Sequence, residues 1–241
     1  MNDDLDLTDF ADLAKINTGP AFIIRKDGKF DYRLLFGLPD SPSYAALVHW
    51  ASTTPNLHAF VRDFHRLQVE YWTWLHAQEL KPTRCLDVGC YQRRDWVCED
   101  YQTLGMDTTG TNDVVGDLTD WDSLAPLGQF DLVIATEVIE HTSNPFVAVA
   151  NVAKLLRPDG VFLASTPFLW PDHHQDTYPD YWRFTTQGWE RLLDGWRDVT
   201  VKPCAWSRMG KAAYTLMADA ECMAQDTAAT TGYLVRATRP A

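Results

Sequence analysis

The sequence predicts an α/β fold built on a mostly parallel sheet, and three observations support this prediction. Residues 84–88 form a short, largely apolar run that leads into Gly89, as expected for a buried strand that turns sharply beneath a ligand. Further apolar runs alternate with helical patterns at a rhythm typical of right-handed parallel crossovers. The chain has 241 residues, of which 46% are hydrophobic, enough to fill the core of a sizeable α/β domain.

The N-terminal third of the chain predicts few functional features. Residues 1–55 begin with an acidic stretch and suggest a hairpin with its turn at 26–28. Residues 57–80 place their apolar side chains on one helical stripe, which predicts a long amphipathic helix that leads into the first strand. We therefore expect residues 1–80 to form an N-terminal helical extension that caps the core, and residues 81–241 to form the main domain.

Acidic residues end the first strands of the predicted sheet. The second strand, residues 101–107, ends in Asp107, which lies 18 residues after Gly89. A carboxylate at that point suits the hydroxyl groups of a ribose, because its two oxygens can accept hydrogen bonds from both. The third strand, residues 113–118, carries Asp117. Acids at neighbouring strand ends predict a nucleotide-like ligand at this edge of the sheet.

The remaining elements follow in chain order. A strand at 130–135 runs into Glu137 and His141, and Ser143, Asn144 and Pro145 supply a cap and a first-turn proline for a helix to residue 156. Residues 157–160 predict a closing turn, and 119–128 a loop. The other expected elements are a strand at 161–167, a helix at 185–196, a strand at 198–204, a helical stretch at 211–223 and a final strand at 232–237.

These motifs together resemble the class I S-adenosylmethionine-dependent methyltransferases. The resemblance covers roughly residues 80–240 and rests on residues 86–90, 105–107, 113–117, 130–133, 137–141 and 155–160. It implies a Rossmann-like, seven-stranded, mostly parallel sheet with helices on both faces and an antiparallel final strand. It also implies that S-adenosyl-L-methionine is the cofactor and that the protein transfers a methyl group.

The resemblance assigns cofactor roles to particular residues of this chain. It places the first-strand loop under the methionine part of the cofactor, the second-strand acid on the ribose and the third-strand acid, with the next backbone group, on the adenine. The cofactor-binding set is then Asp87, Gly89, Asp107, Asp117, Leu118 and Glu137.

One part of the sequence departs from the family pattern. The family has acid-x-Gly-x-Gly-x-Gly after the first strand, whereas Tyr91 and Arg93 occupy the two later glycine positions here. A residue with a Cβ tolerates neither positive φ nor close ligand approach as glycine does. This departure leaves open a catalytically inactive Rossmann-like binding protein. A nicotinamide-dependent oxidoreductase is a weaker alternative, because its G-x-G-x-x-G motif is absent.

Residues 170–185 follow the fifth predicted strand and are the expected acceptor loop. The run resembles a subgroup in which a histidine precedes Pro-x-Asp-Tyr-x-Arg-Phe-Thr, a subgroup often acting on sugars, glycans or small metabolites. This implies Asp180, Tyr181 and Arg183 as substrate-binding residues. The alternative is that the aromatic residues pack the loop down while Asp180 and Arg183 pair with each other. A metal site at Asp172, His173 and His174 was weighed, but we expect no metal ligand there.

Three histidines are candidates for the catalytic base. Transfer of a methyl group to a hydroxyl requires alignment of the two reactants and removal of a proton, which a neutral imidazole near pH 7 can accept. His141 follows the fourth strand, and His173 and His174 lie in the acceptor loop. The alternative for His141 is a helix-start residue that bonds nearby backbone. The sequence leaves the acceptor open between a small molecule and a carbohydrate, with a hydroxyl favoured.

Charge and composition disfavour other classes of partner. The net charge of −12 opposes binding to a phosphate backbone, so we expect no nucleic-acid partner. The five cysteines include no C-x-x-C pair, the N-terminus is acidic, and no apolar stretch approaches 18 residues. These features predict a cytoplasmic protein without a membrane partner, present as a monomer or homodimer.

Overall fold

The computed structural model describes residues 35–36, 64–90, 93–106, 112–170, 172–174, 178–204, 206–207 and 230–240. Two compact units make up the chain: residues 1–68 with 205–229, and residues 69–204 with 230–241. In the first unit the described strands are β1 (Leu35–Phe36) and β8 (Trp206–Ser207), which pair antiparallel. The helical stretch expected at 211–223 lies outside the described residues, as does the expected hairpin apart from Leu35.

A seven-stranded sheet forms the centre of the second unit, in the order β4-β3-β2-β5-β6-β9-β7. The first five strands in this order are parallel, and β9 pairs antiparallel with both of its neighbours. This arrangement confirms the predicted fold class. The strands are β2 (Arg84–Val88), β3 (Asp100–Gly105), β4 (Val114–Val115), β5 (Phe130–Thr136), β6 (Leu156–Pro167), β7 (Arg197–Pro203) and β9 (Gly232–Thr238).

Two helices begin at capping residues that the sequence indicates. The Asn144 side chain accepts a hydrogen bond from the Val147 N–H at the start of one helix, and Thr185 accepts one from the Gly188 N–H at the start of another. The α-helices are α3 (Phe64–Leu80), α4 (Trp121–Leu124), α5 (Pro145–Leu155) and α6 (Thr186–Leu192), and the 3₁₀ helices are η3 (Ala125–Leu127) and η4 (Ile139–His141).

Two local expectations were wrong. The segment 119–128, expected to be a loop, contains α4 and η3, because the Asp120 side chain caps a single turn by accepting from the Asp122 N–H. The turn expected at 157–160 is part of β6, which begins at Leu156 opposite Phe130 and shifts register before the Leu132–Val161 pair. Asp159 has a φ of +63° within that irregular stretch.

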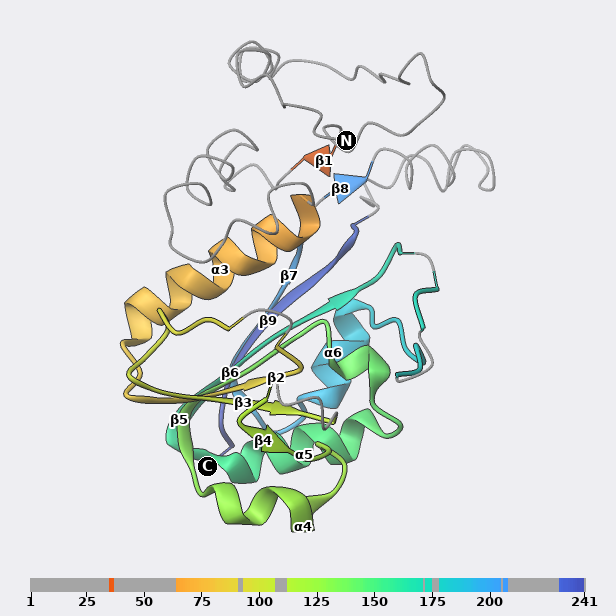
Figure 1. Ribbon diagram of the computed structural model, residues 1–241. Coiled ribbons are helices and arrows are strands. Elements are labelled where there is room, and N and C mark those ends of the chain that lie inside the picture. The colour runs from red at the N-terminus through yellow and green to blue at the C-terminus, as the bar shows by residue number, and fades with distance from the viewer. Residues whose placement is uncertain are drawn as a thin grey trace, which may run out of the picture. The chain divides into compact units, whose positions relative to one another are not determined.

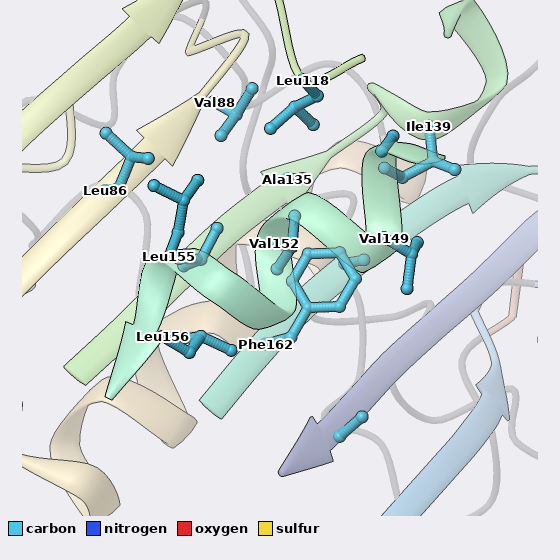
Figure 2. Close-up of a cluster of buried hydrophobic side chains, with 14 of the residues drawn as sticks. Leu86, Val88, Leu118, Ala135, Ile139, Val149, Val152, Leu155, Leu156 and Phe162 are labelled. Carbon is cyan, nitrogen blue, oxygen red and sulfur yellow. The ribbon is translucent and has the colours of Figure 1, made fainter. Parts of the chain in front are cut away.

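Helices cover both faces of the sheet, as predicted (Figure 1). Neighbouring residues of a strand point to opposite faces, so β2 places Leu86 on one face and Cys85 on the other. The first face packs against α4, α5 and α6, and Figure 2 shows Val149, Val152 and Leu155 of α5 beside the strand residues. The second face packs against α3 through residues that include Ala77. Asp87, two residues after Cys85, therefore faces α3.

Candidate functional site

The carboxyl ends of the parallel strands meet at one edge of the sheet, and Gly89 begins the first loop there. Its φ of +63° is costly for other residues, and an added Cβ would lie 2.7 Å from Cγ2 of Val138. Its N–H donates a 2.8 Å hydrogen bond to the Leu104 carbonyl. A glycine is required at this position because the loop turns directly against the segment that follows β5. We call residues 89–94 the donor loop.

Asp87, immediately before this loop, is fully buried and bonded to two other side chains. Nη1 of Arg94 donates to its two carboxylate oxygens at 2.9 and 2.7 Å, and the Tyr101 hydroxyl donates at 2.5 Å. Arg94 also forms a fork with Glu70 at 2.8 and 2.6 Å and donates to Thr136 Oγ1 at 2.8 Å. Glu70, Asp87 and Arg94, with Tyr101 and Thr136, are called the buried ion cluster below.

The cluster sets the charge of the groups around it. Burial alone would lower the pKa of Arg94, but the charges of Asp87 and Glu70 and the hydrogen bonds to Glu70 raise that pKa well above its usual value. Burial, and then the charge of Asp87, raises the pKa of the Cys90 thiol to about 12 and the pKa of Tyr101 well above its ordinary value. The guanidinium is therefore charged near pH 7, while the thiol and the phenol are neutral.

The remaining predicted cofactor residues have different neighbours. Asp107 lies outside the described residues, as does Tyr91 of the donor loop. Asp117 accepts a 2.7 Å hydrogen bond from the Thr119 N–H, and the Leu118 carbonyl accepts one of 2.8 Å from Nδ2 of Asn151. Asn151 was not predicted, because a buried asparagine inside an apolar helix has no motif of its own.

Glu137 has an unusual backbone at the end of β5. Its φ is +57°, a left-handed conformation that is uncommon for a residue with a Cβ. Its N–H donates to the Ser165 carbonyl at 2.9 Å, and Oγ of Ser165 donates to its Oε1 at 2.6 Å. These bonds hold the Glu137 carboxylate at the carboxyl edge between β5 and β6, which is where the sequence places it.

His141 and His173 lie together at the same edge. Their ring centroids are 4.9 Å apart, and the Tyr178 ring lies 4.8 Å from that of His141. Because a carbonyl oxygen can only accept, Nδ1 of His141 donates to Pro179, which leaves Nε2 as the acceptor of the neutral ring. This Nε2 lies 3.6 Å from Oε1 of the fully buried Glu140.

Burial lowers the pKa of His141 below its ordinary value of 6.5, although the bond to Pro179 acts in the opposite direction. The imidazole is therefore neutral near pH 7, as a general base must be. The bond from Nδ1 to the Pro179 carbonyl, which lies 38 residues along the chain, orients the ring. Glu140 was not predicted, although its place in the run 137–141 was a usable signal.

Asp180 organises the acceptor loop. Its carboxylate accepts two hydrogen bonds from Arg183, at 2.5 and 2.7 Å, and lies 2.9 Å from Nδ1 of His173. The bonds from Arg183 hold the pKa of Asp180 well below its ordinary value. The pairing foreseen as the alternative for Asp180 and Arg183 is therefore present, and the same carboxylate orients His173.

Tyr181 and His174, the other predicted site residues of the acceptor loop, have exposed side chains. The Tyr181 side chain is exposed, while its N–H donates to the Glu140 carbonyl at 2.9 Å. His174 is exposed, and its ring pairs with Asp172 at 2.7 Å, which raises its pKa. The structure brings His141 and His173 together and leaves His174 outside this group.

Glu140, His141 and His173 also form a group that could hold a metal ion. One ligand atom from each lies within 4.8 Å of the others. A carboxylate with two imidazoles is a donor set used for divalent metals. It differs from the set of Asp172, His173 and His174 that was considered from the sequence.

Across the described ranges, none of the helices is long and apolar enough to span a bilayer.

Comparison with known proteins identifies the family. The family model described as "Methyltransferase domain" matches residues 61–199, more than half of the chain. A solved structure of a SAM dependent methyltransferase from Archaeoglobus fulgidus covers 73% of this chain and 95% of its own, with a TM-score of 0.51 at 14% identity, a likeness that shows the fold. The chain belongs to this methyltransferase family, and its fold is the Rossmann-like one of class I.

Curated relatives are similar over a shorter stretch. The chain is 30% identical over 105 residues to a "Ubiquinone biosynthesis O-methyltransferase" of Rhodopseudomonas palustris (strain BisB5), covering 36% of this chain and 41% of that protein. A protein of the same name from Bradyrhizobium sp. (strain ORS 278) is 28% identical over 105 residues, with the same coverage. The chain thus spans about two fifths of the length of these relatives.

Proposed function

We propose that this protein uses S-adenosylmethionine to methylate a hydroxyl group of a small-molecule or carbohydrate acceptor, with His141 as the general base. The observation that carries the proposal is the His141–His173 pair beside the buried Glu140, at the carboxyl edge where open α/β sheets bind their ligands. The printed name of the curated relatives, an O-methyltransferase, supports a hydroxyl acceptor.

The residues at the carboxyl edge fit the donor. The backbone turn at Gly89 would lie under its methionine part, Asp107 would accept from the ribose hydroxyls, and Asp117 with Leu118 would meet the adenine. The Glu137 carboxylate, held by Ser165, adds negative charge that suits a cationic ligand. When bound, S-adenosylmethionine supplies an electrophilic methyl group and keeps the pair of electrons of the broken C–S bond.

The chain's own residues handle the acceptor and its proton. His141 accepts the hydroxyl proton at Nε2, since Nδ1 already donates to Pro179. Glu140, 3.6 Å from Nε2, stabilises the imidazolium that forms. Asp180 holds His173 against His141, and Arg183 holds Asp180, so that both rings keep their orientation. Tyr181 offers an exposed ring on which an acceptor could stack.

The base assignment is tested with single histidine variants. His141→Ala should lower turnover about 10² to 10⁴-fold, because a general base typically contributes that much. The affinity for S-adenosylhomocysteine, measured by calorimetry, should stay within a few fold. His174→Ala is the matched control and should keep full turnover. Full turnover in His141→Ala on an identified acceptor would show that the base lies elsewhere, and loss of donor binding would assign His141 to the donor pocket.

The donor assignment is tested separately with Asp107→Ala. Loss of hydrogen bonds to a charged acceptor should cost about 1.5–3 kcal/mol, or roughly tenfold to a hundredfold in affinity for both S-adenosylmethionine and its demethylated product. Unchanged affinity removes Asp107 from the site. A wild-type protein that binds the donor but methylates no acceptor in a panel of phenols, catechols and sugars favours the inactive binding protein.

One observation favours a second way of activating the hydroxyl. The donor atoms of Glu140, His141 and His173 are close enough to hold a divalent cation, which would lower the pKa of a coordinated hydroxyl. Turnover that is lost with a chelator and restored by Mg²⁺ or Mn²⁺ supports this route. Turnover that is indifferent to both supports the imidazole base.

A further inference from the structure

The buried ion cluster connects distant parts of the chain at one end of the sheet. Glu70 lies on α3, Asp87 at the end of β2, Arg94 at the end of the donor loop and Thr136 at the end of β5. The pleat of the strands turns Asp87 toward the face that α3 covers, as it does for Cys85 and Tyr101. The cluster therefore lies between α3 and the carboxyl edge of the sheet.

Arg94 is fixed through both its side chain and its backbone. Its guanidinium donates to the two oxygens of Asp87, the two oxygens of Glu70 and the hydroxyl of Thr136. Its backbone N–H donates to the Tyr101 hydroxyl at 2.9 Å, and that hydroxyl donates in turn to Asp87. All three guanidinium nitrogens are thus bonded inside the protein, and the Arg94 side chain is buried.

The donor loop consequently has two fixed ends. At one end Gly89 is held by its bond to Leu104 and by the close approach of Val138. At the other end Arg94 is held by the cluster. Tyr91 and Arg93, which stand where the family pattern has glycines, lie between these two points. Loop ends that are already fixed lose little entropy when a ligand binds beside them.

We propose that Arg94 is a positioning residue for the methyl donor, with Glu70 of α3 and Asp87 as the counter-charges that hold it. The cluster fixes the Arg94 end of a donor loop that lacks the later glycines of its family, and Arg94 acts without touching the donor. This inference rests on the proposed function, which places the donor over the loop.

The energetics of buried charges distinguish a positioning role of Arg94 from a purely stabilising one. Removing two carboxylates and a guanidinium from water is costly, and replacing such a buried group with neutral side chains of similar size is often neutral or stabilising. If the cluster only filled space, neutral replacements would preserve donor binding. If it positions the loop, neutral replacements keep the fold and weaken donor binding.

The main test uses the variant Glu70→Leu/Asp87→Asn/Arg94→Met, which removes all three charges together. We expect a cooperative urea transition like that of the wild type, amide hydrogen exchange in the peptide spanning residues 89–94 that is at least tenfold faster without ligand, and affinity for S-adenosylhomocysteine at least tenfold weaker by calorimetry. An affinity within twofold of the wild type, with unchanged exchange, would overturn the proposal.

A milder variant covers the case in which the triple variant does not fold. Arg94→Lys keeps the positive charge, but an ammonium cannot form forks with two carboxylates at once. Affinity for S-adenosylhomocysteine should fall about threefold to tenfold while the urea midpoint changes little. Arg157→Met is the control. Arg157 pairs with Asp131 near the amino ends of β5 and β6, at the opposite end of the strands from the proposed donor site, so this variant should leave affinity for S-adenosylhomocysteine unchanged. Equal affinity of Arg94→Lys and the wild type would overturn the proposal.

The two proposals fail in different ways. A wild-type protein that binds no S-adenosylhomocysteine overturns the proposed function and the donor role of Arg94 together. A wild type that binds it, beside a folded triple variant that binds equally well, overturns the role of Arg94 alone.

Discussion

The two loops at the carboxyl edge of the sheet are held in different ways. Arg94 of the donor loop bonds to Glu70 and Thr136, which lie 24 and 42 residues away, and the cluster is buried. Asp180 of the acceptor loop bonds to Arg183 and His173, 3 and 7 residues away, and both partners are partly exposed. The charged contacts of the donor loop therefore reach distant parts of the chain, whereas those of Asp180 are local; the distant contacts of the acceptor loop are the bonds of Pro179 and Tyr181 to His141 and Glu140.

The largest effect that separates the two loops should be on stability. Asp87→Ala leaves a buried guanidinium with one of its two carboxylates, and breaking a buried pair in this way costs about 3–5 kcal/mol. Asp180→Ala removes bonds from partly exposed partners and should cost about 1–3 kcal/mol. The free energies of unfolding come from urea titrations. Equal losses in the two variants would contradict the contrast between a tertiary and a local anchor.

The next effect should be on turnover and should belong to the acceptor loop. Asp180→Asn replaces the carboxylate that orients His173 and pairs with Arg183, and should lower turnover about tenfold to a hundredfold, equivalent to about 1.4–2.7 kcal/mol. Donor affinity should be unchanged. Asp172→Asn, which alters an exposed pair in the same loop, is the control and should keep full turnover. A loss of donor affinity in Asp180→Asn would mean that the two loops are not independent.

A smaller effect concerns pH. The pKa of His141 is lowered from 6.5 by burial, so the folded protein binds fewer protons at this group than the unfolded chain does. Its contribution to stability is fully present above pH 6.5 and is lost as the pH falls toward and below the folded pKa. Turnover should fall over the same acidic interval, because the base becomes protonated. In His141→Ala, the pH profile of stability and the pH profile of turnover should both lose the decrease at acidic pH. Unaltered profiles would exclude His141 as the titrating group.

The smallest effect is expected at the tip of the acceptor loop. His174 is exposed and pairs only with its neighbour Asp172 among the described contacts. The double variant Asp172→Asn/His174→Gln should keep turnover and the urea midpoint within experimental error. A tenfold loss of turnover would show that His174 reaches the acceptor and that the base is shared between the two adjacent histidines.

The strands were predictable from the sequence and the pairing of charges was not. The runs at 84–88 and 130–135 are largely apolar, which identifies buried strands, and Asn144 and Thr185 mark helix starts by their capping chemistry. Asp87 was recognised as a site residue, but its partner Glu70 lies on a helix that only the tertiary fold brings near. The single turn of α4 was missed because four residues are too few for a helical periodicity.

The residues of the candidate site were also predictable only in part. His141, His173 and Glu137 were candidates because they lie in the segments that follow β5 and β6, at the edge where ligands bind. Glu140 was missed because a fully buried carboxylate looks the same in sequence as an exposed one. The exposure of His174 was equally hidden, since adjacent loop residues point in directions that only the packing of the loop decides.

The antiparallel strand β9 has a consequence for the order of events during synthesis. It fills the gap between β6 and β7, yet it is the last of the three to leave the ribosome. At about 5–20 residues per second, β6 waits several seconds with an open edge before residues 232–238 emerge. An unpaired, apolar edge strand is a template for association with other chains. A nascent chain of this protein therefore passes through an interval in which the β6 edge is open, and that interval closes only when β9 is inserted.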